Sequence, residues 1–233
     1  MQSKSLGLIL SAKPIRDNDL YIKILSVNDK VLSGFVYGGN STKKRHTYQL
    51  GYFIEFNQIQ KNSNSINSIN GEIVKPYIGS IYNDKFKSFS LLAIVSIINE
   101  SVYEGVKIDN LFKSVKELVD LINESKHWLS NYCRWLLYFL KLLGYEIDYY
   151  DKNDLKYFNL NSLSLQKLNQ NNTSMLFPHQ LINKNGKVTY ESVKSLFIIF
   201  ETIFEENNLN RFNDKMPVNY LNFKNLILKQ LSN

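Results

Sequence analysis

The densest group of chemically useful side chains is a short basic segment, Lys43-Lys44-Arg45-His46, which ends near Tyr48. Three fixed positive charges and one titratable ring within four residues can neutralise the phosphates of a nucleic-acid strand. A flexible cationic loop can follow a phosphate backbone while aromatic side chains of the surface behind it stack on bases. A solubilising loop would have the same composition, so the charge pattern leaves both interpretations open.

Positive charge is concentrated near the start of the chain. Residues 1–82 contain ten Lys or Arg and five Asp or Glu, a net charge of +5, whereas residues 83–233 contribute only +2. Such an excess favours a polyanionic partner, because basic side chains that neutralise phosphates release counterions. Lys13 and Arg16 could extend the basic patch, although single charges of this kind are commonly solvated. The predicted DNA-binding residues are Lys13, Arg16, Lys43, Lys44, Arg45 and His46.

Residues suited to bond-breaking chemistry are scarce. Asp17 and Asp19 are the tempting pair of carboxylates, but no neighbouring residue completes a metal site, and turn capping explains both. The single cysteine, Cys133, cannot supply the thiolate set of a structural zinc site. No spacing typical of a metal site or a catalytic triad connects the histidines, which are His46, His127 and His179. No glycine-rich phosphate-binding motif occurs, so we predict no catalytic residue, metal, cofactor or small-molecule substrate.

Short strands must position the basic loop. Turn residues and alternating apolar residues predict five strands in the first 80 residues, over 5–13, 20–27, 31–37, 50–59 and 71–77. The last strand is expected to end near Pro76, and the polar run 61–70 is expected to form a hairpin tip. Five strands in so few residues favour a small closed barrel, because closure leaves no exposed edge. The OB-fold is the common oligonucleotide-binding example, and an SH3-like barrel would give much the same pattern.

Helical periodicity replaces strand alternation after residue 82. Apolar spacing predicts helices over 85–103, 128–143 and 191–206, another that Asp109 caps, and a last one that starts at Pro217. Gly144 is a suitable helix stop, and alternation over 157–168 predicts a small hairpin. We therefore predict an α+β chain. Residues 1–80 form a five-stranded OB-fold barrel, and residues 81–233 form an all-α C-terminal domain with a small irregular hairpin insertion.

The sequence shows no feature of a membrane or secreted protein. The N-terminal residues lack the apolar block of a signal peptide, and the longest apolar-rich stretch, 89–98, is too short to span a bilayer. A single cysteine allows no internal disulfide, which fits a reducing compartment. We expect a soluble cytoplasmic protein with no membrane partner.

Several motifs follow one another along the chain. The barrel region contains Gly7-Leu-Ile-Leu-Ser-Ala-Lys-Pro with Asp17-x-Asp19, and Gly34-Phe-Val-Tyr-Gly-Gly followed by the basic loop and Gln49-Leu-Gly. The helical region contains Tyr132-Cys-Arg-Trp-Leu-Leu-Tyr-Phe-Leu-Lys-Leu-Leu-Gly-Tyr-Glu-Ile-Asp148, and then Asp154-Leu-Lys-Tyr-Phe. Each motif alone is loose, but their combination over nearly the whole chain resembles the bacterial DNA repair protein RecO, especially its alphaproteobacterial members.

This resemblance implies an N-terminal OB-fold, a C-terminal helical domain and a recombination mediator of the RecFOR pathway. It implies binding of single- and double-stranded DNA and annealing of complementary strands. It also implies binding of RecR and of the C-terminal tail of single-stranded-DNA-binding protein, which helps to load RecA. The basic loop 43–46 falls on the barrel region where the family's DNA contacts are expected, and the region near Trp135 and Phe139 is where we expect the groove for the tail.

Two features depart from the family pattern. Many relatives carry a four-cysteine zinc site after the long helix, but residues 145–189 contain no cysteine. Zinc is therefore not expected, and the hairpin 157–168 must be held by packing alone. Arginine is also scarce, and lysine lacks the two-pronged hydrogen-bonding geometry of arginine, so binding to the backbone without sequence preference suits this chain.

Two other functions are compatible with the residues. An OB- or SH3-like adaptor could bind only protein partners, with its charge serving solubility. A nuclease would need clustered carboxylates, and only Asp17 and Asp19 offer a pair. The resemblance favours the non-catalytic DNA-binding interpretation over both.

Overall fold

The computed structural model describes residues 4–16, 18–59, 67–74, 79–169, 173–183, 187–209 and 215–232, with the main chain alone for Arg16. The chain divides into two compact units, Met1–Glu117 and Leu118–Asn233. The first unit contains the barrel together with the helices that follow it directly. The division at residue 80 into an OB-fold domain and a helical domain stays a prediction.

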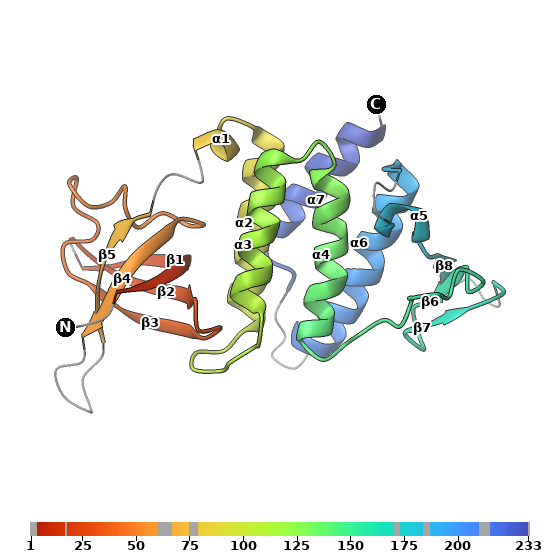
Figure 1. The fold of residues 1–233 in the computed structure, drawn as a ribbon, viewed down its shortest axis with the longest axis horizontal. Helices are drawn as coiled ribbons and strands as arrows, with labels where there is room; N and C mark the ends of the chain where they lie inside the picture. Colours follow the sequence, from red (N-terminus) through yellow and green to blue (C-terminus); the bar gives the residue numbers. More distant parts are fainter. Residues whose placement is uncertain are drawn as a thin grey trace. The chain divides into compact units, whose positions relative to one another are not determined.

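A closed barrel of five strands forms the centre of the first unit (Figure 1). Its strands are β1 (Ser5–Arg16), β2 (Asp19–Ser26), β3 (Val31–Val36), β4 (Phe53–Ile59) and β5 (Ser68–Ile73). They pair in the order β1-β2-β3-β5-β4, and β4 closes on β1. The β3–β5 pair is parallel and the other pairs are antiparallel. This is the strand order of an OB-fold, which confirms the predicted barrel and favours it over the SH3-like alternative.

The barrel interior is filled by alternate residues of the strands. On β2, Ile22 and Ile24 point inward and are fully buried, as the alternation of a strand requires. Gly7 faces the same interior, because a Cβ atom on it would lie 2.3 Å from Cγ2 of Ile24 and 2.8 Å from Cε1 of Phe56. The strand therefore needs glycine at this position so that two large side chains can fill the centre.

The fifth strand differs from the prediction in its limits. It begins at Ser68, within the segment expected to be a hairpin tip, and ends at Ile73. The expected end near Pro76 lies outside the described residues. Asn70, Gly71 and Glu72 pair with β4 although their sequence shows no apolar alternation, so the neighbouring strand determines this element.

Helices complete the first unit. The short helix α1 (Gly79–Tyr82) precedes α2 (Lys85–Ser101), whose first N–H groups are capped by Asp84. Helix α2 packs on β1, and the ring of Phe53 on β4 meets the ring of Phe112 on α3 (Leu111–Glu124) at 6.1 Å. These contacts cover one side of the barrel.

The cap of α3 comes from the barrel rather than from Asp109. Asp29, in the turn between β2 and β3, accepts the N–H of Asn110 at 2.9 Å and the N–H of Phe112 at 2.8 Å. Asp109 instead forms an ion pair with Lys107. An acidic side chain at a helix N-terminus satisfies free N–H groups and favours the helix dipole, so Asp29 ties the β2–β3 turn to α3.

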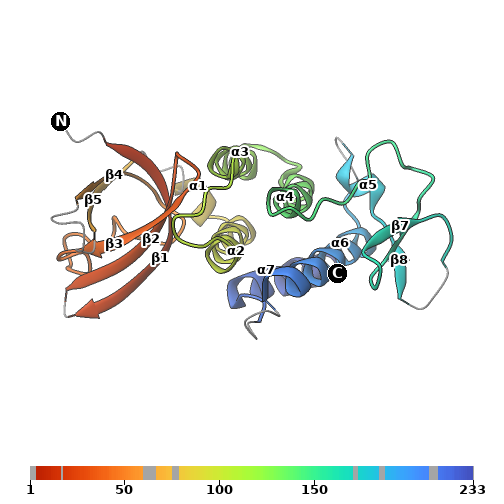
Figure 2. The same cartoon turned by 90° about the horizontal axis from the view of Figure 1, so that it is seen from below.

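The second unit is mainly helical. Helix α4 (Trp128–Leu142) packs on α6 (Tyr190–Phe204), which also contacts α7 (Val218–Ser232) and the short α5 (His179–Ile182) (Figure 2). Helix α6 continues as a π-helical turn, Glu205–Leu209. The unit's core is strongly aromatic, and its fully buried rings include Tyr132, Phe139, Phe197, Phe200, Tyr220 and Phe223. The predicted helices are confirmed within a few residues of their expected ends.

The predicted stop at Gly144 is also confirmed. Gly144 has a φ of +94°, and the next N–H, that of Tyr145, returns to the carbonyl oxygen of Leu140 at 2.8 Å. This bond closes the last turn of α4 in the manner of a Schellman motif. Among the described residues, every helix is too short or too polar to traverse a lipid bilayer.

The predicted hairpin is part of a three-stranded sheet. Strand β6 (Tyr157–Asn159) lies between β7 (Ser164–Gln166) and β8 (Ser174–Leu176). Phe158 is fully buried, and its ring lies 6.3 Å from that of Phe177. The ring of His179 packs edge-on against Phe177, and its Nε2 lies 2.8 Å from the carbonyl oxygen of Leu155. Aromatic packing and this polar contact hold the sheet to the helical unit.

Candidate nucleic-acid interface

Strand pairing aligns functional side chains on the outer face of the barrel. Lys13 on β1 is opposite Tyr21 on β2, and Tyr21 is opposite Phe35 on β3. In the next row, Lys23 pairs with Ser11 and Ser33. Because side chains alternate along a strand, these residues point away from the interior that Ile22 and Ile24 fill. The β1–β2–β3 surface therefore presents cations and aromatic rings side by side.

The aromatic residues of this face are held in a defined arrangement. The rings of Tyr21 and Phe35 meet edge to face at 5.5 Å, and the hydroxyl of Tyr21 donates to Ser33 Oγ at 2.7 Å. Tyr37 follows Phe35 by two residues, so alternation places it on the same side, and 62% of it is exposed. We call these residues the aromatic row: Tyr21, Phe35 and Tyr37. Fixed rings that remain accessible are suited to stacking on unpaired bases.

The basic loop runs from the end of β3 to the start of β4 as a series of hydrogen-bonded turns. The N–H groups of Lys44 and Arg45 both donate to the carbonyl oxygen of Ser41, at 3.0 and 2.9 Å. The N–H of Thr47 then donates to the carbonyl oxygen of Lys44 at 2.9 Å. Lys43, Lys44, Arg45 and His46 are all exposed. Hydrogen bonds within the loop therefore fix its main chain. Its long, exposed side chains are the part that can extend toward a partner.

Tyr48 anchors the end of this loop. Its side chain is 3% exposed and belongs to the barrel core. Its hydroxyl donates to the carbonyl oxygen of Gly71 at 3.2 Å and accepts the N–H of Gly71 at 3.0 Å. Burial raises the pKa of this hydroxyl, so it stays protonated and able to donate. The basic loop is therefore attached to β5 as well as to β3.

The start of the loop is joined to the end of the β1–β2 hairpin. The N–H of Gly38 donates to Asp19 Oδ1 at 2.8 Å, and the N–H of Asn40 donates to the carbonyl oxygen of Asn18 at 2.8 Å. Arg16 pairs with Asp19 in the strand register. The hairpin end and the loop, which the sequence separates by a whole strand, therefore form one continuous edge of the barrel.

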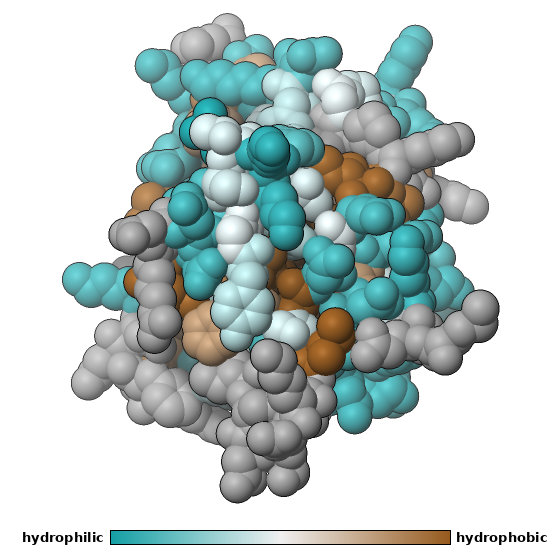
Figure 3. Space-filling model, turned by 90° about the vertical axis from the view of Figure 1, so that its left-hand side faces the viewer, coloured by the Kyte–Doolittle hydropathy of each residue, from teal (hydrophilic) through white to brown (hydrophobic). Residues whose placement is uncertain are grey.

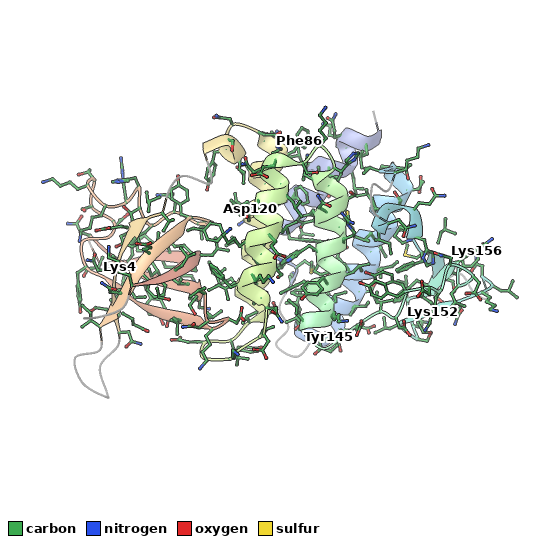
Figure 4. The ribbon with its side chains drawn as sticks, viewed as in Figure 1. Lys4, Phe86, Asp120, Tyr145, Lys152 and Lys156 are labelled. Atoms are coloured by element: carbon green, nitrogen blue, oxygen red, sulfur yellow. The ribbon has the colours of Figure 1, made fainter. Side chains whose placement is uncertain are left out.

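The charges at this edge are available to an outside partner. Within the described part of the chain, Lys13, Lys43, Lys44 and Arg45 form no ion pair. Among the described residues of the second unit, four lysines lie beside carboxylates instead. These pairs are Lys141–Glu146, Lys152–Asp148, Lys167–Asp154 and Lys224–Glu201. Figure 4 shows Lys152 and Lys156 on the segment that leads into β6, and Lys4, the partner of Glu72, on the barrel.

The surface on the barrel side is chemically mixed. Figure 3 faces the barrel side of the molecule and shows mostly hydrophilic side chains with apolar side chains between them. A surface that combines charge with apolar rings can contact both the phosphates and the bases of a strand. A purely solubilising surface would need only the charges.

The predicted site residues are only partly gathered by the structure. Four of them, Lys43 to His46, share the basic loop, and Lys13 projects from the adjoining face. The side chain of Arg16 and the whole of Asp17 lie outside the described residues. Sequence reasoning missed Lys23 and the aromatic row. The alternation of residues 20–27 and 31–37 could have revealed them. In such a pattern they fall on the opposite face of the strand from the isoleucines and valines expected to be buried.

Two side chains with possible chemical roles, Cys133 and His179, are engaged in the fold. Within the described ranges, no group of three or more His, Cys, Asp or Glu side chains comes together to hold a metal ion. Cys133 is buried within α4, and burial raises the pKa of its thiol, which disfavours the reactive thiolate. The ring of His179 is engaged in the packing of the small sheet. These two side chains serve the fold where the structure places them.

The strand order of the barrel and its cationic, aromatic outer face define the class of this chain, which is an OB-fold protein with an appended helical unit.

No family model matches the sequence. The DNA repair protein RecO of Rickettsia canadensis (strain McKiel) is 26% identical over 214 residues, which cover 88% of either chain. RecO of Rickettsia akari (strain Hartford) is 30% identical over 149 residues, 64% of this chain and 62% of the relative. RecO of Rickettsia typhi (strain Wilmington) is 24% identical over 215 residues, 88% of this chain and 90% of the relative. The chain is therefore similar to RecO proteins along most of its length, in agreement with the resemblance of its motifs.

Proposed function

We propose that this chain is a DNA repair and recombination mediator that binds DNA through the outer face of its barrel and catalyses no reaction. The observation that carries the proposal is the set of exposed cations on the basic loop, next to the aromatic row on an OB-fold barrel. Cations neutralise phosphates irrespective of sequence, and aromatic rings stack on bases of any type. The names of the relatives, DNA repair proteins, support the same role.

The mechanism is physical. Two DNA strands repel each other through their phosphates, and a surface that binds one strand by charge lowers the repulsion felt by a second. Lys13, Lys23 and the basic loop supply that charge without reading the sequence. The protein would then hold single- or double-stranded DNA and bring complementary strands together for annealing. No side chain needs to take or give a proton in these steps.

The proposed protein partners are those that the similarity to RecO proteins implies. They are RecR and the C-terminal tail of single-stranded-DNA-binding protein, with RecA loaded as the outcome, in the cytoplasm. The structure limits where the tail could bind. Trp135 and Phe139 stack on each other at 5.0 Å and are 5% and 0% exposed. They belong to the core of the second unit, so any groove in this region must be lined by residues around them.

The adaptor that binds only protein is the competing function. It accounts for the barrel and for the helical unit, but it gives the aromatic row beside unpaired cations no role. The two functions differ in one measurable property, affinity for DNA that falls as salt is raised. An adaptor whose charge serves solubility has no reason to show it.

Fluorescence polarisation of a labelled deoxythymidine oligonucleotide tests the proposal. We expect binding at low salt, with a logarithm of affinity that falls linearly with the logarithm of salt. The double substitution Phe35→Leu and Tyr37→Leu keeps apolar bulk but removes two ring faces. We expect it to weaken binding by about tenfold or more, since stacking contributes ~1–3 kcal/mol per base, while the salt slope is unchanged.

The matched control is Tyr150→Leu in the second unit, where the tyrosine is 63% exposed, close to the exposure of Tyr37. This variant should bind as the unaltered protein does. Absence of salt-dependent binding by the unaltered protein would favour the adaptor. Equal affinity of the double variant and the control would remove base stacking from the proposal and leave the charges alone.

A further inference from the structure

An acidic residue stands at the edge that the proposed DNA strand must follow. Asp19 begins β2, directly opposite Arg16 in the strand register, and is only partly buried. It adjoins Tyr37 and the start of the basic loop through its contact with Gly38. A carboxylate at such a place repels phosphate, so electrostatics alone would favour its removal. Its presence among cations therefore needs a second explanation.

The contact with Gly38 supplies that explanation. Asp19 Oδ1 accepts the N–H of Gly38 at 2.8 Å, at the residue where the chain leaves β3. Gly38 has a φ of +66°, a left-handed conformation that a residue without a Cβ adopts easily. A hydrogen bond to a charged acceptor is stronger than one between neutral groups. Asp19 thus holds the chain at the point where it changes direction.

Further hydrogen bonds connect Gly38 to the cationic residues of the loop. The carbonyl oxygen of Gly38 accepts the N–H of Ser41 at 3.1 Å and the hydroxyl of Ser41 at 2.6 Å. The carbonyl oxygen of Ser41 in turn accepts the N–H groups of Lys44 and Arg45. Each turn of the loop is built on the one before it, so Gly38 sets the place of the cationic side chains. Tyr48 then fixes the far end.

We propose that Asp19 is a positioning residue for DNA binding, which holds the basic loop against the aromatic row at the cost of a small repulsion. This inference rests on the proposed function, because it assigns a role in the same site. It gives an acidic side chain a favourable effect on the binding of a polyanion. If net charge alone governed binding, removing Asp19 would strengthen the binding of DNA. The two explanations can therefore be separated by experiment.

Two substitutions at this position separate charge from position. Asp19→Asn removes the charge but keeps an oxygen that can accept the N–H of Gly38. We expect it to bind a deoxythymidine oligonucleotide about twofold more tightly at low salt, the effect of one charge at roughly 10 Å in water. Asp19→Ala removes both charge and acceptor. We expect it to bind roughly fivefold more weakly, with a flatter salt dependence, because fewer loop cations reach phosphates together.

A second measurement keeps the test decisive if Asp19→Ala is less stable. Amide hydrogen exchange of Gly38 should accelerate in Asp19→Ala and stay slow in Asp19→Asn, while the amides of Ile22 and Ile24 within β2 are unchanged in both. Equal tightening of DNA binding by the two substitutions would overturn the inference, since charge would then explain everything. So would unchanged exchange at Gly38 in Asp19→Ala. Failure of the unaltered protein to bind DNA would instead count against the proposed function.

Discussion

Replacing Lys43, Lys44 and Arg45 together with alanine is expected to weaken the binding of single-stranded DNA of every sequence and to flatten its salt dependence. These three side chains are exposed and form no ion pair within the described part of the chain. If each neutralises one phosphate of a single strand, the slope of log affinity against log salt should fall in magnitude by about 2. Affinity at low salt should then fall by roughly a hundredfold. Polarisation titrations at several salt concentrations measure both quantities.

The matched control removes the same charge from the second unit. Lys126, Lys194 and Lys229 are exposed, and their joint replacement by alanine lowers the net charge by the same amount. If long-range charge alone governs binding, the two triple variants will lose affinity equally. A specific interface on the barrel predicts a large loss for the loop variant and a small one for the control. An unchanged salt slope in the loop variant would exclude the basic loop as the site.

Substitution of Phe56 by alanine is expected to have the largest effect on stability. Phe56 lies on β4, is 2% exposed and belongs to the barrel core with Ile22 and Ile24. Removing a buried ring leaves a cavity, and the free energy of unfolding should fall by about 3–5 kcal/mol. Gly7, on the neighbouring strand, has no side chain that could fill this cavity. Urea unfolding followed by circular dichroism measures the loss.

Phe56→Leu serves as the graded control, because it leaves a smaller cavity at the same position. Its loss of stability should lie between those of the unaltered protein and Phe56→Ala. A cost below about 1 kcal/mol for Phe56→Ala, the size of an ordinary point mutation, would contradict the barrel core described here. DNA binding by the alanine variant should fall only in proportion to the unfolded fraction, since Phe56 points to the interior.

The strands were predictable where their sequence alternates, and the barrel's closure was not. Residues 20–27 show the alternation of a half-buried strand, and β2 lies there. The pairing of β5 with β3 and of β4 with β1 joins segments far apart in the chain, and no local pattern specifies it. For this reason the sequence left OB and SH3-like barrels open, and strand order decided between them.

The sequence likewise predicts only part of the candidate site. The charges of the basic loop are visible as residue types, so the sequence predicts them directly. The aromatic row requires the register that places Tyr21 opposite Phe35, which only the paired strands provide. The contacts of Asp19 with Gly38 and of Asp29 with Asn110 depend on folding that brings distant residues together. Spacing rules for helix caps therefore selected Asp109, the nearest acid, and missed Asp29.

Short strands limited the prediction in the second unit. The region 157–168 alternates and was predicted as a hairpin, which β6 and β7 form. Strand β8 has three residues, Ser174–Leu176, too few for a periodic pattern. Its pairing with β6 and the packing of Phe158 on Phe177 hold it in place. Tertiary contacts, rather than local preference, make this a three-stranded sheet.

Photo-crosslinking most directly tests whether the barrel's outer face binds a single strand. An oligonucleotide that carries 5-iododeoxyuridine reacts preferentially with aromatic side chains that stack on the modified base, and mass spectrometry identifies the attached peptide. We expect crosslinks to peptides that contain Tyr21, Phe35 or Tyr37, and we expect these crosslinks to disappear at high salt. Crosslinks confined to residues 118–233 would instead place the strand on the helical unit and overturn the proposed interface.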